Sequence, residues 1–282
     1  MPILNKDMTL CISLAARPSN IGTRFHNYLY EALGLNYVYK AFAPRDLAQA
    51  VAGIRGLGIR GAAVSMPYKE DVIALVDAMD ASALAIDSVN TIVNDSGVLT
   101  AYNTDYLAIA RLLTVNAIDP AMTVFLRGSG GMAKAVAAAL HDAGFIHVSI
   151  VARNEERGQA LAALYDFSWL PEVDGDAGCA VADANRVPGA GMLINVTPLG
   201  MAGGEETVQS FSDALVQQAQ VVFDVVALPA ETPLIAAARA AGKQVITGAE
   251  VIAIQAEEQF VLYTGVRPSA EQVREASEFS RQ

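Results

Sequence analysis

A cluster of three glycines limits the fold of this chain more than any other feature of its sequence. Gly128, Gly130 and Gly131 separate an apolar run, Met122–Leu126, from an alanine-rich run, Met132–Ala143. The first run has the length of a buried strand, and the second has the length and composition of a helix. Glycines at such a junction let the backbone approach a phosphate, and the helix N-terminus offers free N–H groups and the positive end of a dipole. The segment therefore predicts a phosphate-binding loop.

The loop departs from the complete G-x-G-x-x-G pattern, because Ala133 stands at the position of its last glycine. A bare glycine cluster is also compatible with a tight turn that binds nothing. A second apolar run, His147–Val151, follows the helix and completes a strand–helix–strand unit, which favours a nucleotide-binding loop. Ser129, which lies among the glycines, is a further candidate ligand of the cofactor.

Apolar runs and helical patterns alternate along most of the chain. We expect further strands at Thr9–Leu14, Tyr37–Ala41, Gly61–Met66, Gly191–Asn195 and Val221–Val226, and a hairpin from Thr91–Val93 and Val98–Tyr102. We expect further helices at Phe25–Leu33, Pro44–Gly53, Tyr68–Met79, Tyr106–Val115, Glu155–Tyr165, Pro233–Ala241 and Glu250–Tyr263, followed by the tail Pro268–Ser280.

This alternation predicts an α/β protein with parallel strands and right-handed crossovers. We expect an N-terminal α/β substrate domain and a Rossmann-type, doubly wound nucleotide-binding domain. The nucleotide-binding domain is placed at 107–247, and the substrate domain at 1–106 together with 248–282.

The composition excludes several classes of function. Lys and Arg total 19 and Asp and Glu total 30, which gives a net charge of −11 at pH 7. Such a charge repels phosphate backbones and anionic lipid, so we expect neither a nucleic-acid nor a membrane partner. Hydrophobic residues make up 53% of the chain and charged residues 17%, which predicts a sizeable core and no extensive disorder.

The cysteines and histidines give no sign of a disulfide framework or a metal site. Cys11 and Cys179 lie far apart without a C-x-x-C motif, and His26, His141 and His147 lack the H-E-x-x-H spacing. The N-terminus lacks the basic-then-apolar order of a signal peptide, and no long uncharged apolar run occurs. We therefore expect a cytoplasmic protein without a metal, and the sequence leaves its oligomeric state open.

The end of the second strand of the nucleotide-binding unit carries basic residues. Enzymes that use NAD place an acidic residue there for the ribose 2′-hydroxyl. Here Arg153 and Asn154 follow the strand, and Arg157 lies one helical turn further on. Two guanidinium groups suit a 2′-phosphate, although a solvated helix start is the alternative. This position favours NADP over NAD.

Three polar segments in the N-terminal half are candidates for chemistry. Lys69 lies on the first turn of an expected helix, where a cation opposes the helix dipole and so adds nothing to structure. A surface lysine is nevertheless the better interpretation of Lys69 on its own. Ser88–Thr91 and Asn103–Asp105 fall at the ends of the expected hairpin, and spacing alone favours helix capping for Asn103–Asp105.

Taken together, these motifs resemble those of the shikimate dehydrogenases, and they most resemble the shikimate dehydrogenase-like branch. The resemblance covers nearly the whole chain. The segments that carry it, in the family's order, are Gly61–Glu70 (GAAVSMPYKE), Val89–Thr91, Asn103–Asp105, Gly128–Gly131, Ala152–Asn154, Asn195–Met201 (NVTPLGM) and Gln255–Ala256.

The resemblance implies roles for residues in both domains. Lys69 and Asp105 would be the catalytic pair. The residues that would contact the substrate are Ser65, Asn90, Asp105 and Gln255, with Ser19 and Asn20 as candidates near the N-terminus. The residues that would bind NADP are Gly128, Ser129, Gly130, Gly131, Arg153, Asn154, Arg157, Asn195, Thr197, Pro198 and Met201.

The chain departs from the family where the substrate carboxylate would be held. The family has two serines in the pattern Ser-x-Ser-Pro-x-x-His-Asn. Aligning its last two residues with His26 and Asn27 places Asn20 and Gly22 at the serines and Thr23 at the proline. Ser13 and Ser19 lie nearby in the sequence, and a loop shift would let one of them replace a missing serine.

Two further positions depart from the family pattern. Ala227 stands where a tyrosine is expected, and Glu250 replaces a usual glycine. The catalytic pair is retained while these contacts change. The departures therefore bear on the identity of the substrate and not on the reaction type.

The resemblance implies an NADP-dependent oxidoreductase that interconverts shikimate, or a related cyclic hydroxy acid, and its 3-dehydro ketone by hydride transfer. A lysine held by a carboxylate can move the proton of a secondary alcohol. One alternative is a dehydrogenase of quinate, of an aminated shikimate or of another hydroxy acid. A second alternative is a nucleotide-binding sensor without turnover, but such a protein would not need both Lys69 and Asp105.

Overall fold

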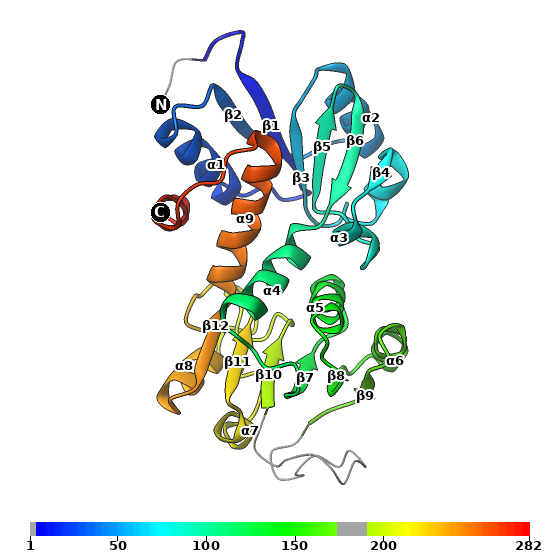
Figure 1. Ribbon diagram of the computed structural model, residues 1–282, viewed down its shortest axis with the longest axis vertical. Coiled ribbons are helices and arrows are strands. Elements are labelled where there is room, and N and C mark those ends of the chain that lie inside the picture. Colours follow the sequence, from blue (N-terminus) through cyan, green and yellow to red (C-terminus); the bar gives the residue numbers. More distant parts are fainter. Residues whose placement is uncertain (1–3, 174–190) are drawn as a thin grey trace. The chain divides into compact units, whose positions relative to one another are not determined.

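The computed structural model describes residues 4–173 and 191–282 and forms two compact units (Figure 1). Unit 1 contains the residues up to Ala108 and from Ala253 to Gln282, and unit 2 runs from Ile109 to Ile252. The boundaries expected from the sequence are 106/107 and 247/248. Helices α4 (Thr104–Val115) and α9 (Gly248–Thr264) each contribute residues to both units.

Unit 1 is built on a mixed sheet with the strand order β2-β1-β3-β5-β6-β4. Its strands are β1 (Thr9–Leu14), β2 (Tyr37–Phe42), β3 (Gly61–Val64), β4 (Ala78–Met79), β5 (Thr91–Asp95) and β6 (Val98–Tyr102). Strand β1 pairs in parallel with β2 and β3, whereas β5 is antiparallel to β3 and β6. The β5–β6 hairpin is confirmed, and its turn residues Ser96 and Gly97 both have positive φ, as two-residue hairpins of this hand require.

Helices cover unit 1 and enclose two apolar clusters. The helices are α1 (Ile21–Ala32), α2 (Leu47–Gly56), α3 (Ala81–Leu84), α10 (Ala270–Ser280) and the second part of α9. One cluster joins Val51 and Ile54 of α2 to the sheet, and the other joins α1 to Phe260 and Tyr263 of α9. A Cβ atom at Gly61 would lie 2.1 Å from the Tyr263 ring, so only glycine lets α9 approach β3 this closely.

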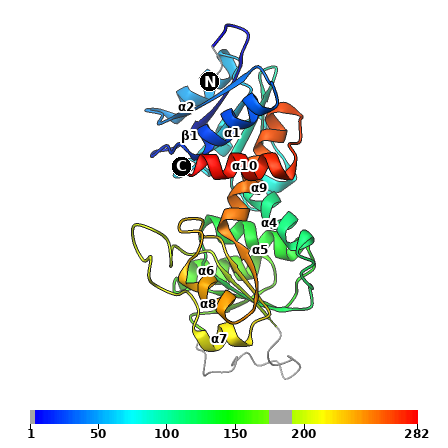
Figure 2. The ribbon, with the colours of Figure 1, turned by 90° about the vertical axis from the view of Figure 1, so that its left-hand side faces the viewer.

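Helix α10 lies against α1 (Figure 2). The Tyr28 hydroxyl hydrogen-bonds the Glu275 carboxylate at 3.0 Å, and the Tyr28 ring contacts the ring of Phe279. A capping box formed by Ser269 and Gln272 begins α10.

The expected helix Tyr68–Met79 is wrong. The structure instead has a short 3-10 helix, η1 (Asp71–Leu75), followed by strand β4. The Asp77 carboxylate accepts hydrogen bonds from the Arg55 guanidinium at 2.6 and 3.0 Å and from the Leu99 amide at 2.7 Å. These contacts, and the pairing of β4 with β6, draw the segment onto the sheet edge. Distant partners in the sequence therefore override its local helical pattern.

Unit 2 contains a parallel sheet with the strand order β12-β11-β10-β7-β8-β9. Its strands are β7 (Thr123–Arg127), β8 (Val148–Val151), β9 (Ser168–Leu170), β10 (Gly191–Asn195), β11 (Val221–Asp224) and β12 (Gln244–Thr247). Its remaining helices are α5 (Gly131–Asp142), α6 (Glu155–Leu164), α7 (Asp213–Gln218) and α8 (Pro233–Ala240). The strand order reverses between β7 and β10, which confirms the doubly wound class and places the ligand-binding switch point there.

In the part of the chain that the structure describes, no helix has both the length and the apolar character needed to cross a bilayer. Cys11 is a buried free thiol in β1, and burial raises its pKa to about 11. Cys179 lies outside the described residues.

Candidate active site

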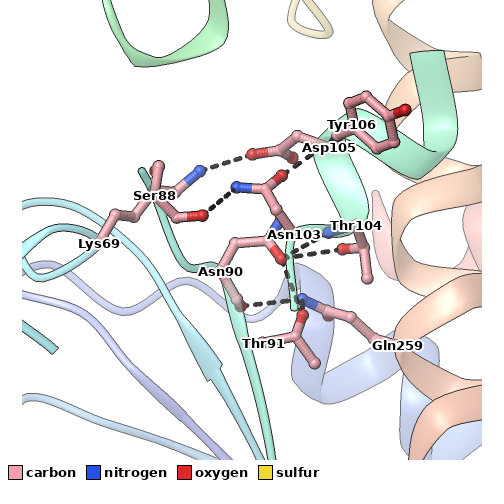
Figure 3. Close-up of polar contacts among 9 residues, drawn as sticks. All are labelled: Lys69, Ser88, Asn90, Thr91, Asn103, Thr104, Asp105, Tyr106 and Gln259. Atoms are coloured by element: carbon pink, nitrogen blue, oxygen red, sulfur yellow. Dashed lines mark hydrogen bonds and ion pairs between the residues drawn. The ribbon is translucent and has the colours of Figure 1, made fainter. Parts of the chain in front are cut away.

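An ion pair joins two of the predicted residues in unit 1 (Figure 3). The Lys69 Nζ atom lies 2.6 Å from Oδ2 of Asp105. Lys69 follows β3 in a turn closed by a hydrogen bond from the Tyr68 amide to the Ser65 carbonyl, and Asp105 lies in the first turn of α4. The Lys69 carbonyl also accepts a hydrogen bond from the Val89 amide at 2.9 Å. Segments far apart in the sequence thus hold the pair together.

Asn103 fixes the start of the helix that carries Asp105. Its Oδ1 atom accepts a hydrogen bond from the Tyr106 amide at 3.1 Å, and its Nδ2 atom donates to the Ser88 carbonyl at 2.9 Å. The capping role expected for this segment is therefore confirmed for Asn103. The Asp105 side chain instead contacts Lys69. Asn103 therefore caps the helix, and Asp105 forms the ion pair.

Asn90 is buried beside this pair, with 1% of its surface exposed. Its Oδ1 atom accepts hydrogen bonds from the Thr91 hydroxyl (2.9 Å), the Thr104 amide (2.8 Å) and the Thr104 hydroxyl (3.2 Å). Among the described residues, its Nδ2 donor has no partner. An unpaired buried donor costs about 1–3 kcal/mol. This donor can pair with an oxygen of a bound ligand.

The other predicted substrate residues lie outside this network. Ser65 is exposed after β3, and Gln255 is half-buried on α9. Ser19 and Asn20 are exposed at the start of α1, where Asn20 occupies the N-cap position without a capping hydrogen bond from its side chain. Their roles stay predictions.

The His-Asn pair of α1 has a structural role in unit 1. The Asn27 amide donates to the carbonyls of Thr23 (2.8 Å) and Tyr39 (2.9 Å) and accepts from the Tyr39 amide (3.0 Å), which ties α1 to β2. The His26 ring is fully buried and stacks on Tyr39, with 4.4 Å between the ring centroids. Desolvation lowers the pKa of His26 to about 3, so this imidazole is neutral at pH 7.

Gly22 lies in the first turn of α1 near the Tyr39 hydroxyl. A Cβ atom at Gly22 would meet Tyr39 Oη at 3.6 Å, an ordinary van der Waals distance. Burial raises the pKa of Tyr39, and hydrogen bonding with Ser13 acts in the opposite direction. Ser13 and Gly22 thus both lie near the Tyr39 side chain, while Ser19 stays exposed.

In unit 2 the glycine loop lies between β7 and α5, as expected. Gly128 has a φ of +127°, and a Cβ atom there would lie 2.7 Å from the side chain of Val196. Gly130 is the N-cap of α5, and no atom lies within 4 Å of a Cβ placed on Gly130 or Gly131. Ser129 is half-buried between them. The loop has the open surface and the helix N-terminus that a pyrophosphate requires.

Arg153, Asn154 and Arg157 are exposed after β8, where the sequence places them. Asn154 is the N-cap of α6, because its Oδ1 atom accepts a hydrogen bond from the Arg157 amide at 2.9 Å. Glu172 pairs with Arg127, and its pKa is lowered by that pair first and also by the charge of Arg153.

Asn195 holds the loop that follows β10. Its fully buried amide donates to Asp224 Oδ1 (3.0 Å) and the Leu199 carbonyl (3.2 Å) and accepts from the Thr197 hydroxyl (2.6 Å). Asp224 also accepts from the Thr232 hydroxyl at 2.7 Å, and burial raises its pKa. The Asn195 amide thus holds the conformation of the loop after β10 through its hydrogen bonds to Thr197 and Leu199. Thr197 is half-buried, and Pro198 and Met201 are exposed on it.

Glu250 also has a structural role. One of its carboxylate oxygens accepts hydrogen bonds from the amide (2.8 Å) and hydroxyl (2.7 Å) of Thr247, which caps the start of α9. Thr91 and Thr104 lie inside candidate segments, but neither was expected to have a role of its own. Sequence reasoning assigned no role to Asp224 or Gln259, because each acts through a neighbour in space. Over residues 4–173 and 191–282, no group of His, Cys, Asp and Glu side chains could hold a metal ion.

Comparison with known proteins gives concordant results over both units. Residues 20–92 match the shikimate dehydrogenase substrate binding domain. A shikimate dehydrogenase-like protein of Haemophilus influenzae is 51% identical over 280 residues, or 99% of each chain. The NADP(+) shikimate dehydrogenase of Moorella thermoacetica is 38% identical over 269 residues, or 92% of this chain and 90% of that one.

Two solved structures share the fold. Shikimate 5-dehydrogenase of Thermus thermophilus, in complex with NADP(H) and shikimate, has a TM-score of 0.82 and 26% identity over 97% of this chain and 99% of that one. Quinate dehydrogenase of Corynebacterium glutamicum, in complex with NAD, has a TM-score of 0.81 and 28% identity over 95% of this chain and 98% of that one.

Proposed function

Because the chain belongs to the shikimate dehydrogenase family, we propose that it is an NADP-dependent oxidoreductase that interconverts shikimate, or a related cyclic hydroxy acid, and its 3-dehydro ketone. The observation that carries this proposal is the ion pair between Lys69 and Asp105, at 2.6 Å beside the unpaired donor of Asn90. A protein that only binds nucleotide has no use for this combination.

The residues of unit 2 fit a dinucleotide phosphate. The open glycine loop and the N-terminus of α5 would hold the pyrophosphate, and Arg153 and Arg157 would hold the 2′-phosphate. The loop from Thr197 to Met201 would line the nicotinamide side. When bound, NADP supplies the hydride chemistry of the reaction.

The residues of unit 1 would handle the substrate and its proton. The Lys69 amine would take the proton from the reacting hydroxyl during oxidation and return it during reduction. The Asp105 carboxylate would orient that hydroxyl and stabilise the charged form of Lys69. The Nδ2 atom of Asn90 would donate to another ring hydroxyl, and Ser65 and Gln255 would add contacts at the substrate.

Quinate and other cyclic hydroxy acids stay alternative substrates for a specific reason. Asn20 and Gly22 replace the two serines that grip the carboxylate in the family, and Ser13 is connected to this position only through the Tyr39 side chain, which lies near both Ser13 and Gly22. We therefore expect weak binding of shikimate. We place the enzyme in the cytoplasm, and its net charge of −11 argues against nucleic-acid and membrane partners.

A turnover screen tests this function. Purified enzyme is mixed with shikimate, quinate or an aminated shikimate and with NADP or NAD, and the reduced nicotinamide is measured by its absorbance. We expect turnover of a cyclic hydroxy acid with NADP, and loss of it in Lys69→Ala. If the chain binds NADP in a direct titration but reduces it with none of these compounds, the sensor alternative replaces the enzyme.

A further inference from the structure

Gln259 has no role in the proposed reaction, yet its side chain contacts the polar network of the site (Figure 3). It lies on α9, one turn after Gln255, and only 5% of its surface is exposed. Its Nε2 atom donates to the Thr91 hydroxyl at 3.0 Å and to the Asn90 carbonyl at 3.3 Å. A buried amide is therefore directed at Asn90 and at Thr91, the first residue of β5.

The Thr91 hydroxyl links this amide to the Asn90 side chain. A hydroxyl has a single proton to donate. Because Thr91 Oγ1 accepts from Gln259, its own proton is directed to Asn90 Oδ1, at 2.9 Å. The hydrogen bond from Gln259 thus leaves the Thr91 hydroxyl to donate its proton to Asn90 Oδ1.

The same hydrogen bonds determine the orientation of the Asn90 side-chain amide, that is, which position holds Oδ1 and which holds Nδ2. The Thr104 backbone amide, 2.8 Å from Oδ1, can only donate a hydrogen bond. If the Asn90 amide were rotated by half a turn, its NH2 group would face the donors of both Thr91 and Thr104. The oxygen is held by these donors, and the NH2 group is left for a ligand.

We propose that Gln259 is a positioning residue for substrate recognition, which acts through the Thr91 hydroxyl to keep the Asn90 NH2 group directed at a substrate hydroxyl. This inference rests on the proposed function, since it requires Asn90 to contact substrate. Packing alone does not require a glutamine here, because leucine fills a similar volume without two buried donors that need acceptors.

Kinetics of matched variants test the proposal. We expect Gln259→Leu to raise KM for the cyclic hydroxy acid by about 3–10-fold, the effect of weakening one neutral hydrogen bond, with kcat within about twofold. Thr91→Val should act like Gln259→Leu, and Thr91→Ser, which keeps the hydroxyl, should restore KM. Gln272→Leu is the control, because this half-buried glutamine of the same unit serves the capping box of α10 and is not part of the network around Asn90.

A double-mutant cycle separates positioning from a general loss of stability. In an Asn90→Ala background, Gln259→Leu should leave KM unchanged, because the group that it positions is gone. If Gln259→Leu lowers Tm but leaves KM unchanged in the wild-type background, or if its effect on KM persists without Asn90, the proposal is overturned.

A spectroscopic measurement keeps the test independent of turnover. In protein labelled with 15N-asparagine, the Asn90 side-chain NH2 signals are assigned by their loss in Asn90→Ala. We expect these signals to shift or broaden in Gln259→Leu and to stay in place in Gln272→Leu. Unchanged signals would overturn the positioning role even in an active enzyme, whereas absence of turnover in wild type would overturn only the proposed function.

Discussion

The Asp105 carboxylate keeps 6% of its side-chain surface exposed, while the Lys69 ammonium that it contacts at 2.6 Å keeps 28%. The carboxylate is therefore shielded from water, so its charge acts on Lys69 with little screening. The lysine reaches solvent and can exchange a proton with it. In the proposed reaction, Asp105 would fix the geometry of the pair and Lys69 would connect proton transfer to bulk water.

Replacing Lys69 tests the proposed catalytic pair directly. Lys69→Ala should lower kcat by about 10²–10⁴-fold, the usual loss when a general acid–base group is removed. The Kd for NADP should hardly change, because the proposed cofactor residues belong to unit 2. Lys6→Ala removes an exposed lysine of unit 1 and is the control. Near-normal kcat in Lys69→Ala would exclude Lys69 from proton transfer.

Arg153 should decide the choice of cofactor. A hydrogen bond to a charged group contributes about 1.5–3 kcal/mol, so Arg153→Ala should weaken NADP binding by roughly 10–150-fold. NAD, which lacks the 2′-phosphate, should bind the variant and the wild type alike. Calorimetric titration of both cofactors measures this, with Arg281→Ala as an exposed control. Tighter binding of NAD than NADP by the wild type would contradict the assignment.

Restoring the family serines should improve the binding of shikimate. Each serine would add a hydrogen bond to the carboxylate, so Asn20→Ser with Gly22→Ser should lower KM by about 10²–10⁴-fold. The structure has room for the change, because a Cβ at Gly22 lies 3.6 Å from the Tyr39 hydroxyl.

Ser13→Ala in the wild type is the companion experiment to the double serine variant. Ser13 would bind the carboxylate only if it replaces a missing serine, so a raised KM in Ser13→Ala would identify it as the replacement. A KM that the double serine variant leaves unchanged would refute the argument from Asn20 and Gly22.

His26 should make stability depend on pH. Its pKa is about 3 in the folded protein and 6.5 in the reference state, so the unfolded chain binds a proton first as pH falls. The free energy of unfolding should therefore decrease below pH 6.5, by about 1.4 kcal/mol per pH unit from this group, until the pH nears 3. Urea unfolding of wild type and His26→Phe across this range measures the difference. Equal slopes in the two proteins would contradict the prediction.

The sequence predicts the parallel sheet of unit 2 well, because its central strands are short apolar runs next to clear helical patterns. Strands β4, β9 and β12 and helices α3, α7 and α10 were not predicted. Short elements and edge strands depend on partners far away in the sequence. The segment after Pro67 shows most clearly where prediction from the local sequence pattern fails. Its apolar spacing resembles a helix, but Arg55 and β6 hold it as a strand.

Some residues of the candidate site can be predicted from local sequence, and others can be recognised only from their contacts in the folded chain. Glycine patterns and strand ends mark the cofactor loop, because local backbone geometry determines which residues are tolerated there. Lys69 alone is no more than a surface lysine, and only its contact with Asp105 in the folded chain gives it chemical meaning. Gln259 carries no motif of its own, so its link to Asn90 is visible only through the Thr91 hydroxyl.

The packing of unit 1 requires two parts of the chain that are far apart in the sequence, the residues up to Ala108 and those from Ala253 to Gln282. The ring of Tyr263 fills the space above Gly61, and the Arg60 guanidinium donates to the Tyr263 carbonyl at 3.0 Å. A ribosome synthesises α1 and the sheet of unit 1 before unit 2, but the second part of α9 and all of α10 follow only after unit 2. The aromatic face of α1 stays uncovered throughout this interval. Unit 1, which holds Lys69 and Asp105, is thus begun before unit 2 in translation and completed after it.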